Sequence, residues 1–143
     1  MNVTQVSLFL ENKPGHLQHV LKVLAERDIN ILTLTIAELA DYGIVRMIVN
    51  RPDEAIAALR TEHITCSATD VLAIAIDDTP GALLKALDTF AARNLNIEYM
   101  YAFTEKRDGY AIMIFRFENI DKAKEALAAE GFNIIAKIDI IGA

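Results

Sequence analysis

The sequence predicts an α+β fold built from two tandem halves, each with the element order β-α-β-β-α-β. A repeat is the first observation: residues 14–48 match residues 80–114 with identity at 11 of 35 positions, where average residue usage gives about two by chance. The second observation concerns the separation between matching positions of the two copies. It is 66 residues at first and becomes 68 residues later in the repeat, while the pattern of matches continues. Solenoids need about three or more short units. Two long copies therefore predict two domains, residues 1–69 and 70–143.

Each half begins with a strand followed by a helix. Apolar residues alternate with other residues over 6–10 and 72–76, as in a strand covered on one face. A Pro-Gly pair follows in both halves, and then apolar residues recur at the spacing of one helix face. In the two halves these residues are Leu17, Val20, Leu21 and Leu24, and Leu83, Ala86, Leu87 and Phe90.

A hairpin, a second helix and a fourth strand complete each half. The predicted hairpins run over 30–49 and 96–117, with turns at Asp41-Tyr42-Gly43 and Arg107-Asp108-Gly109. Short Ala-rich helices are expected to begin at Asp53 and Asp121, and last strands to cover 64–69 and 133–141. This order predicts ferredoxin-like domains, each an antiparallel four-stranded sheet with both helices on one face.

The predicted central strands carry apolar residues on both faces. The face of each sheet that the helices do not cover is therefore expected to be apolar too. Val45 and Met47 alternate with Ile44 and Ile48, and the second half repeats the pattern. We expect this face to pack against sheet from the other half or from another chain. The alternative is that Tyr99 and Tyr101 lie at the rim of the sheet, with their hydroxyl groups exposed to solvent, and do not cover the apolar face.

Composition excludes several classes of protein. With 53% hydrophobic and 24% charged residues, the chain is expected to be ordered. A net charge of -6 opposes nucleic-acid binding, which depends on Lys and Arg. No apolar run is long enough to span a bilayer and the first residues lack a signal peptide, so we expect a cytoplasmic protein. Cys66 is the single cysteine and is expected to be a small core residue.

The repeated strand-to-helix loop is the candidate binding element. It reads Asn12-Lys13-Pro14-Gly15-His16-Leu17 in the first half and Asp78-Thr79-Pro80-Gly81-Ala82-Leu83 in the second. Proline is expected in the first helical turn. The N–H groups of Gly15, His16 and Leu17 are then free to point from the helix N-terminus, which suits a carboxylate. The alternative is a purely structural role, in which Pro-Gly only starts a helix.

A repeated asparagine is the second candidate element. Asn30-Ile31 and Asn96-Ile97 begin the next strand in each half, and we expect them at the same end of the sheet as the loop. A side-chain amide both donates and accepts hydrogen bonds, so the pair of elements suits a free α-amino acid. Here too the alternative is structural, with asparagine only turning the chain.

The motifs Asn12-x-Pro14-Gly15-x-Leu17 and Ile29-Asn30-Ile31, with their copies in the second half, resemble those of the ACT domain family. The resemblance covers the whole chain as two tandem domains. It implies that an amino acid binds at an interface between paired ACT domains and that the chain regulates an enzyme in trans, with a homodimer as the expected state. The ligand positions that it implies are Asn12, Gly15, His16, Leu17 and Asn30, and Gly81, Ala82, Leu83 and Asn96.

The second half departs from this pattern at Asp78, where the first has Asn12. A carboxylate there repels a ligand carboxylate but attracts an ammonium, so the first site is expected to be the better one. A ligand-free assembly module is the alternative function. Arg46 is expected to pair with Glu38 across the first hairpin rather than to bind ligand.

Catalysis and a metal or other cofactor are not expected. His16 and His19 lie one turn apart without a cluster of Cys, Asp or Glu at metal-ligand spacing. No nucleophile motif, phosphate-binding loop or dinucleotide fingerprint occurs in the sequence. The sequence does not identify the amino acid or the regulated enzyme.

Overall fold

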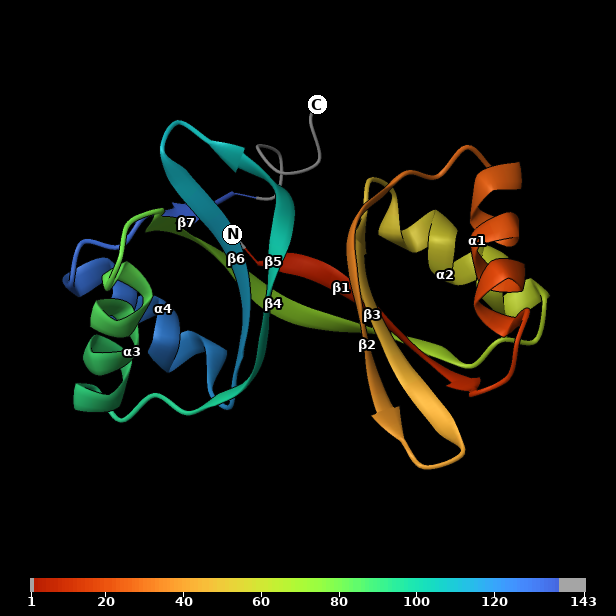
Figure 1. Ribbon diagram of the computed structural model, residues 1–143, viewed down its shortest axis with the longest axis horizontal. Coiled ribbons are helices and arrows are strands. Elements are labelled where there is room, and N and C mark those ends of the chain that lie inside the picture. Colours follow the sequence, from red (N-terminus) through yellow and green to blue (C-terminus); the bar gives the residue numbers. More distant parts are fainter. Residues whose placement is uncertain (1, 137–143) are drawn as a thin grey trace. The chain divides into compact units, whose positions relative to one another are not determined.

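The computed structural model describes residues 2–136, without the side chains of Leu39 and residues 104–107. The chain divides into two compact units (Figure 1). The N-terminal unit comprises residues 4–69, and the C-terminal unit comprises residues 70–136 together with residues 2 and 3. In the described part of the chain, no helix is long and apolar enough to cross a membrane.

The N-terminal unit has the predicted element order. Strand β1 (Val3–Glu11), helix α1 (His16–Glu26), strands β2 (Ile31–Leu39) and β3 (Tyr42–Val49) and helix α2 (Pro52–Thr61) are followed by strand β4 (Cys66–Asp77). The strands are arranged in the order β2-β3-β1-β4, and β3 pairs antiparallel with both of its neighbours. Both helices cover one face of the sheet (Figure 1).

The C-terminal unit repeats this arrangement. Helix α3 (Ala82–Ala92), strands β5 (Ile97–Arg107) and β6 (Tyr110–Phe117), helix α4 (Ile120–Ala129) and strand β7 (Ile134–Ile135) follow β4. The strand order is β5-β6-β4-β7, with antiparallel pairs throughout. The predicted α+β fold of tandem ferredoxin-like domains is thus confirmed. Of the predicted last strand over 133–141, residues 137–141 lie outside the described residues.

Strand β4 differs from the prediction. Two strands were expected, over 64–69 and 72–76, but Cys66–Asp77 forms a single strand of 12 residues. Apolar alternation continues through both segments, and no glycine or proline interrupts the sequence between them. Backbone pairing can therefore continue without a turn.

The hairpin turns are also shorter than predicted. In the first hairpin Leu39 pairs with Tyr42, so the turn is Ala40-Asp41 and Gly43 belongs to β3. In the second hairpin the turn is Asp108-Gly109, and both residues have positive φ (45° and 82°). Positive φ at both central residues is the type I′ geometry that matches strand twist, and Asp-Gly favours it.

The hairpin contains the two-residue difference between the halves. Tyr42 pairs with Glu11, and Tyr110 pairs with Asp77, so β6 follows β3 at an offset of 68 while the preceding strands keep 66. The register irregularity between Ala102 and Lys106 lies at this place in β5. The matching pair Gly43 and Gly109 in the sequence alignment is therefore not structurally equivalent.

Each unit has its own hydrophobic core between sheet and helices. In the N-terminal unit, Leu8, Leu24, Met47 and Leu59 are completely buried. The core of the C-terminal unit surrounds Phe90 of α3, whose ring lies 5.4 Å from those of both Phe115 and Phe117 in edge-to-face geometry. Such ring pairs contribute about 0.5–1.5 kcal/mol beyond their buried area. Phe90 therefore joins α3 to strand β6.

Replacing Phe90 with alanine is expected to lower the free energy of unfolding by about 3–5 kcal/mol, because it removes a fully buried ring. Leu84→Ala on the same helix is the control: Leu84 is 63% exposed, and its loss should change stability by less than about 0.5 kcal/mol. Urea denaturation followed by circular dichroism measures both. Equal costs for the two variants would contradict this core.

Candidate functional site

The two strand-to-helix loops have nearly the same backbone. Gly15 is the N-cap of α1 with φ 89° and ψ -14°, and Gly81 is the N-cap of α3 with φ 84° and ψ -8°. These values lie in the left-handed region, which glycine enters without steric cost. Pro14 therefore lies before the N-cap and not in the first helical turn as predicted, because the left-handed glycine separates it from the helix.

The helix N-termini offer fewer free donors than predicted. His16 N–H donates to Lys13 O at 3.3 Å, and Ala82 N–H donates to Thr79 O at 3.2 Å. Each bond closes the turn that contains proline. Among the described residues, no acceptor faces the N–H groups of Gly15 and Leu17, or those of Gly81 and Leu83. Each loop thus presents two donors at the positive end of a helix dipole.

Both loops are attached to the adjacent hairpin turn. Asn12 N–H donates to Asp41 O at 2.8 Å, and Asp78 N–H donates to Gly109 O at 3.0 Å. These bonds place the loop and the hairpin turn at the same end of the sheet in each unit. The loop is therefore held by the sheet on one side and by the helix on the other.

The repeated asparagines do not lie beside the loops, contrary to the prediction. Strands β1 and β2 are both antiparallel to β3 and so run in the same direction. Asn30, which precedes β2, is thus at the opposite end of the sheet from the loop that follows β1. Helix α1 connects the two ends, and its 11 residues span about 16 Å. Asn96 is separated from the second loop in the same way.

Backbone hydrogen bonds hold both asparagines at this far end. Asn30 N–H donates to Asn50 Oδ1 at 2.9 Å, and Asn50 N–H donates to Asn30 O at 3.1 Å. In the other unit Glu118 N–H donates to Asn96 O at 3.0 Å. Arg51 Nη2 also donates to Arg27 O at 2.9 Å. Ile31 and Ile97, which directly follow the two asparagines in the sequence, pack against the cores of their units.

Two opposite charges near the first loop are already paired with each other. Lys13 Nζ lies 2.9 Å from Glu11 Oε2, and this hydrogen bond and the lysine charge lower the pKa of the Glu11 carboxyl. Both side chains are exposed. The small cavity here has a volume of about 430 Å³ and is lined by Glu11, Asn12, Lys13, Ala40, Asp41 and Tyr42.

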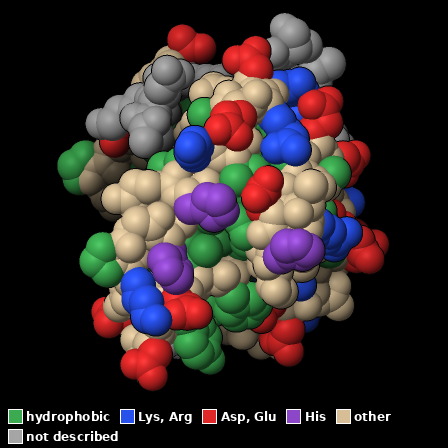
Figure 2. All heavy atoms as spheres, turned by 90° about the vertical axis from the view of Figure 1, so that its right-hand side faces the viewer, with side chains coloured by type: hydrophobic (Ala, Val, Ile, Leu, Met, Phe, Trp, Pro, Cys, Tyr) green, Lys and Arg blue, Asp and Glu red, His purple; other side chains and the backbone are tan. Residues whose placement is uncertain are grey.

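Helix α1 also carries two of the three histidines. Figure 2 shows the histidines distributed over the face that it displays, with other side chains between them. Within the described residues, no three His, Cys, Asp or Glu side chains are placed to hold a metal ion. His16 is half-buried at the loop, and His19 and His63 are exposed.

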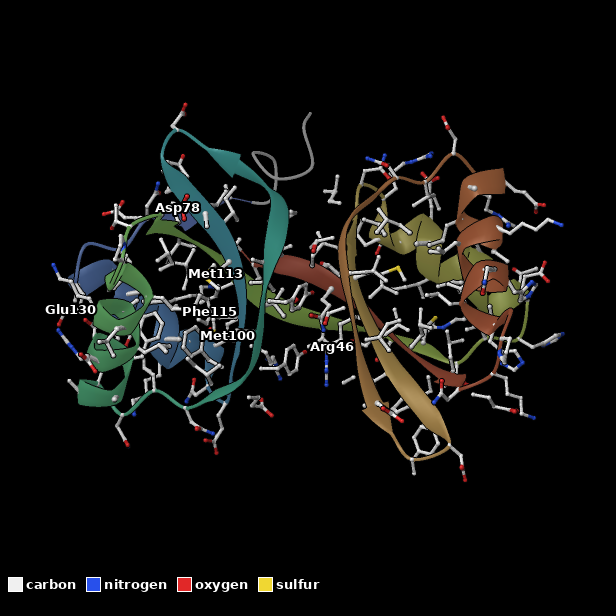
Figure 3. All side chains as sticks on the ribbon, in the orientation of Figure 1. Arg46, Asp78, Met100, Met113, Phe115 and Glu130 are labelled. Carbon is white, nitrogen blue, oxygen red and sulfur yellow. The ribbon has the colours of Figure 1, made fainter. Side chains whose placement is uncertain are left out.

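A larger cavity adjoins the second loop. Its volume is about 690 Å³, within the range of small-molecule sites. Glu130, labelled in Figure 3, forms part of the lining and is also paired with Arg93 at 2.6 Å. The polar residues around this cavity include Asp77, Thr79, Lys85, Glu130 and Asn133, beside Pro80, Gly81 and Ala82 of the loop. The arrangement offers groups of both charges next to free N–H donors.

Arg46, also labelled in Figure 3, does not pair with Glu38. It lies opposite Thr35 and Ser7 in the middle of the sheet, on the face without helices, whereas Glu38 lies opposite Gly43 on the helix face. The prediction of this ion pair is wrong, because two side chains on opposite faces of a sheet cannot meet.

Replacing Gly15 or Gly81 with alanine is expected to lower the free energy of unfolding by about 1–2 kcal/mol, because a side chain disfavours the left-handed region. A Cβ at either position meets nothing within 4 Å, so the cost is one of backbone conformation alone. Asparagine tolerates this region better and should cost less. Thermal and urea denaturation of the Ala and Asn variants test the ranking, and alanine variants as stable as wild type would refute the backbone argument.

Comparison with known proteins identifies the family. A family model described as "ACT domain pair" matches residues 1–142. A protein of Methanothermobacter thermautotrophicus named "Probable acetolactate synthase small subunit" is 30% identical over 138 residues, which are 94% of this chain and 77% of that protein.

Solved structures agree with this match. The crystal structure of a Bacteroides thetaiotaomicron protein is similar over 100% of this chain and 98% of its own, with 41% identity and a TM-score of 0.93. The regulatory subunit of aspartate kinase from Thermus thermophilus shares the fold over 89% of both chains, with 21% identity and a TM-score of 0.62. The chain belongs to the ACT domain pair family.

Proposed function

We propose that this chain is a non-catalytic sensor that binds a free amino acid between paired ACT domains and regulates an enzyme of amino-acid metabolism in trans. The repeated glycine-capped loop carries this proposal, because in each unit it presents two N–H donors at a helix N-terminus for which the described part of the chain supplies no acceptor. The relative named as a small subunit of acetolactate synthase supports action on an enzyme formed by another chain.

The ligand carboxylate is assigned to these N–H donors. Hydrogen bonds to a charged group contribute about 1.5–3 kcal/mol each, and burial of an apolar ligand side chain adds about 1.5–3 kcal/mol. After the cost of association, this supports binding at tens to hundreds of micromolar, or roughly -5 to -7 kcal/mol. Such an affinity suits a sensor of metabolite concentration.

The ligand needs a second domain. The loop and the asparagine of one unit lie at opposite ends of helix α1, about 16 Å apart, which is too far for one small amino acid to contact both. We assign the loop to one ACT domain and the asparagine amide to an ACT domain of a second copy of the chain, whose strands run in the opposite direction. The proposed domain limits remain residues 1–69 and 70–143.

The test is titration of the full chain with each of the twenty amino acids by calorimetry, with thermal melting in parallel. We expect one or a few of them to bind at tens to hundreds of micromolar and to stabilise the native state by about 2.7 kcal/mol when present at 100 times the dissociation constant. Gly15→Val and Asn30→Ala should each weaken binding at least about tenfold, or about 1.4 kcal/mol.

Two further variants and one control complete this experiment. Gly81→Val and Asn96→Ala report on the second loop and its asparagine, and Glu125→Ala is the control because Glu125 is exposed and distant from both elements in the sequence. Circular dichroism verifies that every variant folds. If no amino acid binds, the sensor proposal fails and a ligand-free assembly module becomes the better account.

Arg46→Met is expected to change ligand affinity less than about threefold, since less than 1 kcal/mol is involved when a residue does not contact the ligand. Arg46 lies in the middle of β3, between the end with the loop and the end with the asparagine. The same calorimetric titration measures it. A tenfold loss of affinity would place Arg46 in the binding site.

A further inference from the structure

The cavity beside the second loop lies within a single unit. All of its lining residues belong to the C-terminal unit, so a ligand bound there needs no second domain. Its walls are the loop over 79–82, one side of helix α3 and the segment 130–133 after α4, where Figure 3 labels Glu130. Its volume of about 690 Å³ is sufficient for a small metabolite. The ligand of the proposed function lies between two domains, so this cavity is a separate candidate site.

Small side chains on helix α3 leave room for this cavity. Ala82, Lys85, Ala86 and Thr89 all line it, and their spacing of three or four residues places them on one face of the helix. Ala86 is buried and Ala82 is half-buried. An alanine side chain ends at Cβ, so these two positions fill little of the space between α3 and the segment 130–133.

The N-terminal unit has larger side chains at the corresponding positions. In the alignment of the two halves, Ala82 corresponds to His16, Ala86 to Val20 and Gly131 to His63. The backbone is alike at the last of these pairs, because Gly131 and His63 both have positive φ (77° and 59°). The backbone is therefore preserved between the copies, and smaller side chains open the cavity in one of them.

The inner surface of the cavity is apolar. Ile76 and Ala86 line it and are buried, and Phe132 lines it while packing against the core of the unit. The Phe132 ring lies 5.5 Å from the ring of Phe90, which supports it from the core side. This surface favours a ligand with an apolar body, because contact removes apolar area of both from water.

Lys85 gives the cavity an unpaired positive charge. In the described part of the chain, no carboxylate pairs with Lys85, whereas Glu130 is paired with Arg93 at 2.6 Å. Asp77 follows Ile76, whose side chain is in the core beneath the helices, so the Asp77 carboxylate lies on the opposite face of the sheet. On the helix side, the described lining therefore favours an anionic group.

We propose that this cavity binds a small carboxylic acid that has an apolar body and no ammonium group. Its carboxylate pairs with Lys85 Nζ, and its body covers Ile76, Ala86 and Phe132. An ammonium group beside the carboxylate meets no unpaired acidic side chain in the described lining on the helix side, and its removal from water is costly. The cavity therefore discriminates against free amino acids, and it is independent of the site shared between domains.

Ligand-observed NMR titration of the full chain tests this site. The probe is isocaproate, and leucine is the matched competitor because it differs from isocaproate only by the ammonium group. We expect isocaproate to bind with a Kd below about 1 mM, and leucine to displace it only at concentrations at least about tenfold higher. Lys85→Gln should weaken isocaproate binding at least about tenfold. Lys124→Gln removes the same charge from α4, away from the lining, and should change binding less than about twofold.

Two substitutions taken from the N-terminal unit fill the cavity. Gly131→His and Ala82→His introduce the residues that stand at the matching positions 63 and 16. A Cβ at Gly131 meets nothing within 4 Å, and circular dichroism verifies that both variants fold. Each should weaken isocaproate binding at least about tenfold, because the added imidazole occupies the space of the apolar body.

The asparagine variants distinguish this site from the shared one. Asn30→Ala and Asn96→Ala should leave isocaproate binding unchanged, because neither residue lines the cavity. The proposal would be overturned by isocaproate that does not bind at about 10 mM, by binding that persists in Lys85→Gln or in both histidine variants, by displacement at equal concentrations of leucine, or by loss of binding in the asparagine variants. Amino-acid binding at the shared site is measured separately and stands or falls independently of these results.

Discussion

Antiparallel pairing with a central strand organises each of the two units. β3 pairs with β1 and β2, and β6 pairs with β4 and β5. This pairing brings the apolar faces together beneath the helices. It also determines the direction of each strand, and direction decides which end of the sheet receives each loop. The glycine-capped loop and the hairpin turn share one end, and the asparagine lies at the other.

The duplicated loop shows how a similar backbone can serve unequal sites. Both loops have a left-handed glycine and two N–H donors without acceptors in the described structure. At the first loop, Lys13 is already paired with Glu11. Beside the second lies the larger cavity, with Lys85 and Asp77 in its lining. Backbone geometry is therefore preserved between the copies, while the surrounding charges differ.

Much of the fold can be predicted from the sequence because apolar spacing reports local geometry. Helix faces such as Val20 and Leu24, and strand positions such as Val45 and Met47, follow directly from their periodicity. Periodicity does not reveal where one strand ends and the next begins, so β4 was predicted as two strands. The two-residue difference in the hairpin was likewise hidden, because chance identities such as Gly43 with Gly109 extend the alignment past it.

The candidate site was harder to predict than the fold, because it depends on strand direction. Asn30 follows the loop closely in sequence, but helix α1 returns the chain to the opposite end of the sheet before β2 begins. The number of free donors also depended on a turn, since Lys13 O accepts from His16 N–H. Residue types alone do not specify either feature.

The most direct test of this account is complementation between two binding-deficient variants. Gly15→Val lacks a working loop and Asn30→Ala lacks the amide, but a mixed dimer contains one site with an intact loop from one copy and an intact Asn30 from the other. Random exchange makes about half of the dimers mixed, so an equal mixture should recover about a quarter of the wild-type binding capacity. Calorimetric titration of the mixture with the identified amino acid measures this recovery. A mixture that binds no better than either variant alone would contradict a site shared between two copies.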